Sequence, residues 1–167
     1  MPRPSALWKQ MSPDRRLQAA EAFWRGENDP AELAEVVTLL AQRLKFRTKS
    51  FVVLPIAKKA QYLVGLPSPP EMIAARLLVA YHMTHQRPLM GAFLDALGVA
   101  HDNGAIGEEA EVAPTAEKTR AAAQSIAASF PAEDVALYLS TLYWQGPETW
   151  GALAELPEAA LPAQTQA

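Results

Sequence analysis

Three histidines are the side chains of this sequence best suited to metal or acid-base chemistry. They are His82, His85 and His101, and Asp102 follows the last of them directly. Imidazoles three residues apart on a helix lie on neighbouring faces and can share a metal ion when a third ligand approaches from a loop. The spacing is HxxH, without the glutamate that serves as the base in HExxH zinc hydrolases. Two interpretations stay open: a small metal-dependent or acid-base enzyme, or, as we favour, histidines held by hydrogen bonds in or beside the core.

Two arginines fall on one stripe of the same predicted helix. Arg76 and Arg87 could clamp an anion, pair with acidic residues of a neighbouring helix, or mark the wet face of the helix. Arg87 also precedes Pro88, where the carbonyl groups of an ending helix attract a cation. One candidate polar cluster therefore lies at the end of this helix: His82, His85, Arg87, His101 and Asp102.

A basic segment covers residues 43–59. No acidic residue occurs between Glu35 and Glu71, and Phe46 and Phe51 lie among the cations. Such a segment could neutralise phosphates while its aromatic rings stack on bases, so it is a candidate anion-binding or nucleic-acid-binding site. Its six cationic residues are Arg43, Lys45, Arg47, Lys49, Lys58 and Lys59.

An acidic block follows further along the chain. It has no basic residue before Lys118 and consists of Asp95, Asp102, Glu108, Glu109, Glu111 and Glu117. The basic and acidic blocks could pair within one chain or between subunits, which would remove the need for nucleic acid. We favour a solvated or self-paired charged face over nucleic-acid binding.

Composition limits the class of protein. With 167 residues, half of them hydrophobic, the chain can bury one core, so we expect a single helical domain over 1–167. Zero cysteines exclude disulfides and thiolate metal sites and are consistent with a reducing compartment. The N-terminus lacks an apolar signal region, and the most apolar window is too short to cross a bilayer. We therefore expect a cytoplasmic, bacterial-type protein that does not bind membranes.

The element that must position the histidines is a central helix over residues 70–87. Between Met72 and Met83 only Arg76 and His82 are strongly polar, which is typical of a helix buried on most sides. Pro88 should end it with a bend at Arg87, and a separate short helix should stop at Gly98. Capping residues and prolines predict further helices that begin at Pro13, Pro30, Pro55, Thr115, Pro131 and Pro147.

The remaining segments are irregular. Asn103-Gly104 is the preferred pair for a type I′ turn, so residues 99–106 could form a small β-hairpin. Phe51, Val52 and Val53 begin either a short strand or a single apolar turn. We expect an N-terminal arm over 1–11, where Pro2 and Pro4 oppose regular structure, and a flexible tail over 157–167.

These patterns predict an all-α protein, a bundle or helical-hairpin array of about seven helices around the central helix. No serine-hydrolase, phosphate-loop or dinucleotide motif occurs, so we assign no catalytic residue, metal ligand or cofactor. The leading functional hypothesis is a non-enzymatic protein-interaction or scaffold module that binds a partner or itself. The alternatives are nucleic-acid binding through 43–59 and a small metal-dependent enzyme that uses His82, His85 and His101.

Overall fold

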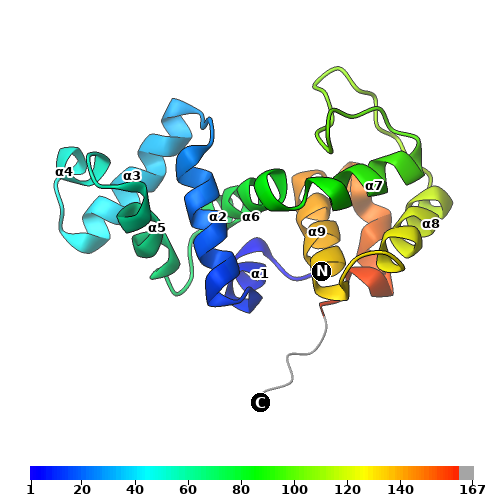
Figure 1. Cartoon of the computed structure of the whole chain (residues 1–167), viewed down its shortest axis with the longest axis horizontal. Coiled ribbons are helices and arrows are strands. Elements are labelled where there is room, and N and C mark those ends of the chain that lie inside the picture. The colour runs from blue at the N-terminus through cyan, green and yellow to red at the C-terminus, as the bar shows by residue number, and fades with distance from the viewer. Residues whose placement is uncertain (162–167) are drawn as a thin grey trace, which may run out of the picture. The chain divides into compact units, whose positions relative to one another are not determined.

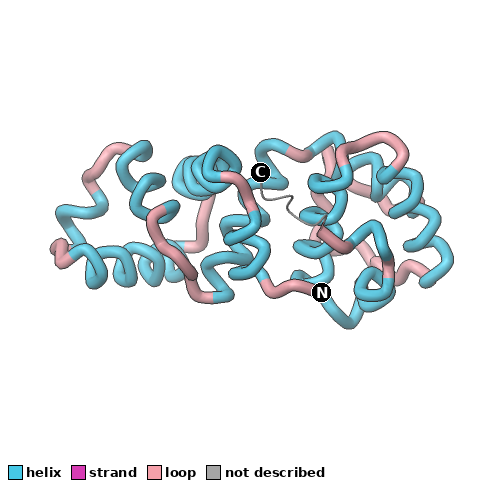
Figure 2. Tube along the Cα trace, turned by 90° about the horizontal axis from the view of Figure 1, so that it is seen from below, coloured by secondary structure: helices cyan, strands magenta, loops and turns pink. Residues whose placement is uncertain are grey.

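The computed structural model describes residues 1–161, and within that range the regular structure is helical throughout, without a β-strand (Figures 1 and 2). The prediction of an all-α, multi-helix fold is therefore confirmed. Ten α-helices and two 3₁₀ turns occur in these residues, which is more than the seven or so helices predicted. Helices α1 and α4 are the ones that the sequence did not predict. The elements are α1 (Pro4–Gln10), α2 (Pro13–Arg25), α3 (Pro30–Leu44), α4 (Thr48–Val52), α5 (Ile56–Val64), α6 (Glu71–His85), α7 (Arg87–Leu97), α8 (Ala116–Ala127), α9 (Ala132–Gln145), α10 (Pro147–Trp150), η1 (Gly151–Glu155) and η2 (Pro157–Ala159).

The chain divides into two compact units. The N-terminal unit is Pro4–Tyr81, and the C-terminal unit is His82–Ala167 together with Met1–Arg3. Met1–Arg3 belongs with the second unit because the Trp144 indole donates a 2.6 Å hydrogen bond to the Pro2 carbonyl. The boundary falls inside α6, between Tyr81 and His82. A single domain over 1–167 remains a prediction, and the units are described one at a time below.

Local signals set the helix starts of the N-terminal unit. The Ser12 hydroxyl accepts from the Arg15 amide at 3.3 Å and caps α2. Asp29 Oδ1 accepts from the amides of Ala31 and Glu32 at 2.9 and 3.2 Å and caps α3. Such caps satisfy amides that have no partner within the helix, and each is typically worth about 1 kcal/mol. Both helices begin where the sequence predicts.

The expected irregular arm over 1–11 is wrong for residues 4–10, which form α1. Pro4 lies in the first turn, where its missing amide costs nothing. Leu7 and Trp8 are fully buried, and the Ser5 hydroxyl donates a 2.6 Å hydrogen bond to Glu71 at the start of α6. Burial and a tertiary hydrogen bond therefore stabilise a helix that is too short to form alone.

A series of aromatic rings fixes α4 to the body of the N-terminal unit. Phe51 on α4 is fully buried, with its ring 5.9 Å from Trp24 on α2 and 6.2 Å from Tyr62 on α5. Phe46, just before α4, meets the other side of Tyr62 edge-on at 5.9 Å. The FVV run is therefore the end of a helix followed by a turn, and the strand alternative is wrong.

Helix α6 begins and ends close to the predicted central helix. Its buried residues are Ile73, Ala74, Leu77, Leu78, Tyr81 and His82. Arg76 pairs with two carboxylates of α3, Glu32 at 2.9 Å and Glu35 at 3.3 Å, which confirms the reading that it binds acids of a neighbouring helix. The break falls at Gln86, one residue before the predicted bend, and α7 then ends at Gly98 in the left-handed conformation (φ 72°).

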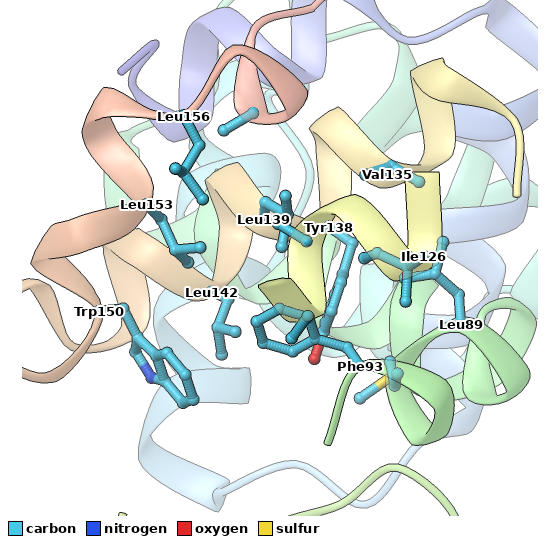
Figure 3. Close-up of a cluster of buried hydrophobic side chains, with 14 of the residues drawn as sticks. Leu89, Phe93, Ile126, Val135, Tyr138, Leu139, Leu142, Trp150, Leu153 and Leu156 are labelled. Carbon is cyan, nitrogen blue, oxygen red and sulfur yellow. The ribbon is translucent and has the colours of Figure 1, made fainter. Parts of the chain in front are cut away.

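The core of the C-terminal unit lies between α7, α8 and α9 and is closed by the last turns of the chain. Figure 3 shows Phe93 of α7, Ile126 of α8 and Leu139 of α9 in one cluster. The Phe93 ring lies 5.7 Å from Tyr138 and 6.0 Å from Trp150. Thr115 caps α8 by accepting from the Lys118 amide at 3.2 Å, as its position in the sequence predicts.

The predicted tail over 157–167 is ordered at its start. Pro157–Ala159 forms η2, Ala159 is buried, and the Ser140 hydroxyl on α9 donates a 3.2 Å hydrogen bond to the Ala159 carbonyl. The expectation of a flexible tail is therefore wrong for residues 157–159. Residues 162–167 lie outside the described part of the chain.

The predicted hairpin near Asn103 is reduced to its turn. Asn103 and Gly104 both have positive φ, 46° and 85°, as a type I′ turn requires. Asp102 and Ala105 exchange two backbone hydrogen bonds of 2.8 and 2.9 Å, and this single bridge is all the strand pairing in residues 99–106.

Candidate functional site

His82 is a core residue. It is 2% exposed, and its Nε2 lies 3.1 Å from the Thr141 hydroxyl on α9. Because that hydroxyl donates its own proton to the Leu137 carbonyl at 2.8 Å, it accepts from His82, which places the imidazole proton on Nε2. The ring also meets Tyr138 edge-on at 5.5 Å, and burial raises the pKa of the Tyr138 hydroxyl. His82 therefore stands among groups that hold it in place.

His85, one turn later, is exposed, so the two histidines of the HxxH pair end in different environments. Among residues 1–161, no group of three or more histidine, aspartate or glutamate side chains is arranged to hold a metal ion. In these residues the HxxH spacing is therefore not accompanied by an arrangement of side chains that could bind a metal ion.

His101 uses both of its ring nitrogens inside the C-terminal unit. Nδ1 accepts from the Gly104 amide at 2.9 Å, so the proton is on Nε2, which lies 3.1 Å from Asp95 Oδ1 and donates to it. The ring closes the turn formed by residues 101–105, which we call the His101 turn. Asp102 contributes its backbone to that turn, and its side chain is exposed.

Arg87 fixes the His101 turn to the helices beneath it. Its Nε donates to the Met83 carbonyl of α6 at 2.6 Å, and one terminal nitrogen donates to the Asn103 carbonyl at 2.9 Å. Gly104 packs so closely on α7 that an added Cβ would lie 2.7 Å from Met90 Cβ and 3.1 Å from the Arg87 carbonyl. Arg87, His101 and the backbone of Asp102 thus come together and hold the His101 turn in place. His82 instead forms a hydrogen bond with Thr141 of α9.

The basic segment folds into one small part of the N-terminal unit. Arg43 is in the last turn of α3, Lys45 and Arg47 are in the connection, Lys49 is in α4, and Lys58 and Lys59 are in α5. Lys45 is left-handed (φ 55°), a strained conformation for a lysine that turns the chain out of α3. All except Lys59 are exposed.

Lys59 differs from the other five cations. Its Nζ lies 5.0 Å from the centre of the Trp24 ring and 3.4 Å from the Val52 carbonyl, so it holds the start of α5 against the end of α4. Within the N-terminal unit, as the structure describes it, none of the remaining five cations forms an ion pair with an acidic side chain. They are Arg43, Lys45, Arg47, Lys49 and Lys58.

Three exposed apolar side chains lie among these cations. Phe46 is 41%, Val52 53% and Val53 80% exposed. Phe51, the second ring expected to stack on bases, is fully buried and unavailable. The exposure of Val52 and Val53 was not expected from the sequence, because a run of apolar residues normally indicates burial. We define the α4 surface as Arg43, Lys45, Phe46, Arg47, Lys49, Val52, Val53 and Lys58.

The acidic block lies in the C-terminal unit. Asp95 bonds to His101, and the loop over residues 107–115, which we call the acidic loop, carries Glu108, Glu109 and Glu111. All three glutamates are exposed, and in the described part of their unit none forms an ion pair. Ile106 and Val112 pack against the core of the unit and hold the ends of this acidic stretch.

Comparison with known proteins finds no matching family model, no matching curated protein and no matching solved structure. None of the helices in residues 1–161 has the length and apolar character needed to cross a bilayer.

Proposed function

We propose that this protein is a non-enzymatic interaction module and that it binds a protein partner through the α4 surface. The observation that carries the proposal is the exposure of Val53, Val52 and Phe46 among five cations that have no ion-pair partner in their unit. Protein interfaces combine an apolar centre with a polar rim and are enriched in aromatic residues and arginine. The α4 surface has this composition.

Helix α4 has few stabilising side chains at its N-terminus. Arg47 is the N-cap of α4, its side chain makes no capping hydrogen bond, and no acidic residue occurs in the first turn. Lys49 lies in the last turn of this five-residue helix, where a cation suits the helix dipole. Arg47 is thus an exposed cation at the end of the helix where the dipole favours negative charge, which supports a role in recognition.

The partner we propose presents acidic and apolar side chains together. Carboxylates would pair with the cations, and apolar groups would cover Val52 and Val53. Nucleic acid has less support, because Phe46 is the one aromatic ring of the α4 surface and valine offers no stacking face. An enzyme has less support again, because both ring nitrogens of His101 are engaged within the chain. Location in a bacterial-type cytoplasm stays a prediction.

Site-specific photo-crosslinking tests the proposal. A photoreactive amino acid at Val53 should give a protein adduct in cells, and the same group at Met72, an exposed apolar residue of the same unit outside the α4 surface, should not. Adding Arg47→Glu and Lys49→Glu should remove the Val53 adduct. Equal labelling at both positions, or labelling that survives the charge reversals, would overturn the proposal. An adduct removed by nuclease would assign the surface to nucleic acid instead.

A further inference from the structure

We infer that the partner of the α4 surface is a second copy of this chain, which docks through its acidic loop. The inference rests on the function proposed above and names the occupant of that surface. Its basis is charge complementarity between two unpaired surfaces in different units of the same protein.

The two surfaces match in charge. The five cations of the α4 surface have no ion pair in the described part of their unit, and Glu108, Glu109 and Glu111 are exposed in the acidic loop with no ion pair in the described part of theirs. Glu117, in the first turn of α8, is exposed beside them. Over the whole chain the basic block and the acidic block hold six charges each, while the net charge is only −3. Both patches are therefore strong local charges on a nearly neutral molecule, the arrangement that steers association between copies.

Both surfaces are also held in shape before they meet. The rings of Phe46 and Tyr62 and the contact of Lys59 with Val52 fix the α4 surface. The packed side chains of Ile106 and Val112 fix the acidic loop. Preformed surfaces lose less conformational freedom on binding, so modest charge and apolar contacts are enough.

The contact joins two different surfaces. Two copies can exchange both contacts in a two-fold dimer, or each copy can pass the contact on to the next, which gives a larger ring or an open chain. Such an assembly grows with protein concentration and weakens as salt screens the charges.

Reciprocal charge reversal tests the inference. The measurement is the molar mass of the full-length protein by light scattering over a concentration series, at low ionic strength and at about 1 M NaCl. The wild-type chain should exceed the mass of a monomer at low salt only. Arg47→Glu with Lys49→Glu, and separately Glu108→Lys with Glu109→Lys, should each weaken self-association about tenfold or more.

Mixing the two reversed proteins is the decisive step. Neither reversed protein should associate with itself, because each keeps only one of the two surfaces intact. In an equimolar mixture the intact α4 surface of the Glu108→Lys, Glu109→Lys protein should bind the intact acidic loop of the Arg47→Glu, Lys49→Glu protein, so a one-to-one complex should form. A control that reverses Arg3 and Lys9, two exposed cations that belong to neither surface, to glutamate changes the net charge by as much as the Arg47→Glu, Lys49→Glu variant does and should associate as the wild type does. Far-ultraviolet circular dichroism confirms that each variant is folded.

A monomer at every concentration and salt, or an assembly that both reversals leave intact, would overturn the inference. The proposed function is judged separately by the Val53 crosslink. An adduct with another protein, found beside a strictly monomeric chain, keeps the interaction module and removes the second copy as its occupant.

Discussion

In the His101 turn both nitrogens of the imidazole ring have partners inside the chain, whereas none of the five cations of the α4 surface has an ion pair in the described part of its unit. The two regions also treat apolar groups differently. The His101 turn lies so close to α7 that Gly104 leaves no room for a side chain, and the α4 surface leaves Val53 80% exposed. One region satisfies its polar groups within the chain, and the other leaves charged and apolar groups exposed.

The difference shows that residue type alone does not mark a functional site. The predicted polar cluster combined histidine, aspartate and arginine, which are residue types that could do chemistry. In the structure the hydrogen bonds of Arg87 and His101, the latter with Asp95, hold a turn in place. Lysines and arginines are ordinary surface residues, but those of the α4 surface have no ion pair in the described part of their unit and occur together with exposed valines. The function proposed above is therefore based on exposed groups without ion pairs and not on reactive residue types.

The largest effect should follow from filling the space at Gly104. Gly104→Val places a side chain at φ 85° and against Met90 and the Arg87 carbonyl, so the free energy of unfolding should fall by about 3 kcal/mol. Urea denaturation followed by circular dichroism measures the change. Gly107→Val is the matched control, because nothing lies within 4 Å of its added Cβ, and it should cost far less. Similar losses for both would show that the His101 turn is not closely packed.

A smaller loss should follow from removing the imidazole. His101→Ala leaves the Gly104 amide without its acceptor and Asp95 without its donor, so unfolding should become easier by about 1 to 2 kcal/mol. Asp102→Ala, which removes an exposed side chain from the same turn, should change stability by less than about 0.5 kcal/mol. Thermal unfolding of both variants compares them. A His101 variant as stable as the wild type would remove the structural role assigned to this histidine.

Two adjacent lysines of α5 allow a comparison within the basic segment between Lys59, which contacts the fold, and Lys58, which is exposed. Lys59→Met loses a cation over the Trp24 ring and should cost about 0.5 to 1 kcal/mol, while Lys58→Met should be close to neutral. Chemical denaturation of the two single variants is sufficient. If Lys58→Met lowers the free energy of unfolding as much as Lys59→Met does, the α4 surface contributes to stability as the His101 turn does. The contrast between the two regions would then be wrong.

The smallest effect concerns the charge of α4 itself. Lys49→Glu replaces an exposed cation by an anion in a helix of five residues, where the opposite effects of the two helix ends overlap, so stability should change by no more than about 0.3 kcal/mol. Differential scanning calorimetry at low salt resolves a change of this size. A loss of about 1 kcal/mol would mean that Lys49 serves the fold and is not held for a partner.

Much of the fold was predictable because its signals are local. Ser12, Asp29 and Thr115 are caps that act within three residues, and each starts a helix in the structure. Gly98 and the Asn103-Gly104 pair likewise adopt the positive φ values that their residue types favour. Such features need no knowledge of the rest of the chain.

Features that depend on tertiary contacts were not predictable. Helix α1 follows from the burial of Leu7 and Trp8, and α4 from the contacts of the buried Phe51 ring with Trp24 and Tyr62. For the candidate site, the sequence identified the basic segment and the histidines but not which of them have partners. His101 meets Asp95 and Gly104 only because a loop folds back on α7, and no periodic pattern encodes that contact.

The position of Trp24 gives the protein a built-in optical signal. Its indole contacts Phe51 and Lys59, and its buried N–H has no hydrogen-bond partner among the described residues. The emission colour of an indole depends on nearby charge and on hydrogen bonding to its nitrogen, so any displacement of Lys59 should shift the fluorescence of Trp24. With Trp8, Trp144 and Trp150 replaced by phenylalanine, Trp24 would be the single tryptophan of the chain. Its fluorescence would then report on the contacts with Phe51 and Lys59 that support the α4 surface, without an added dye.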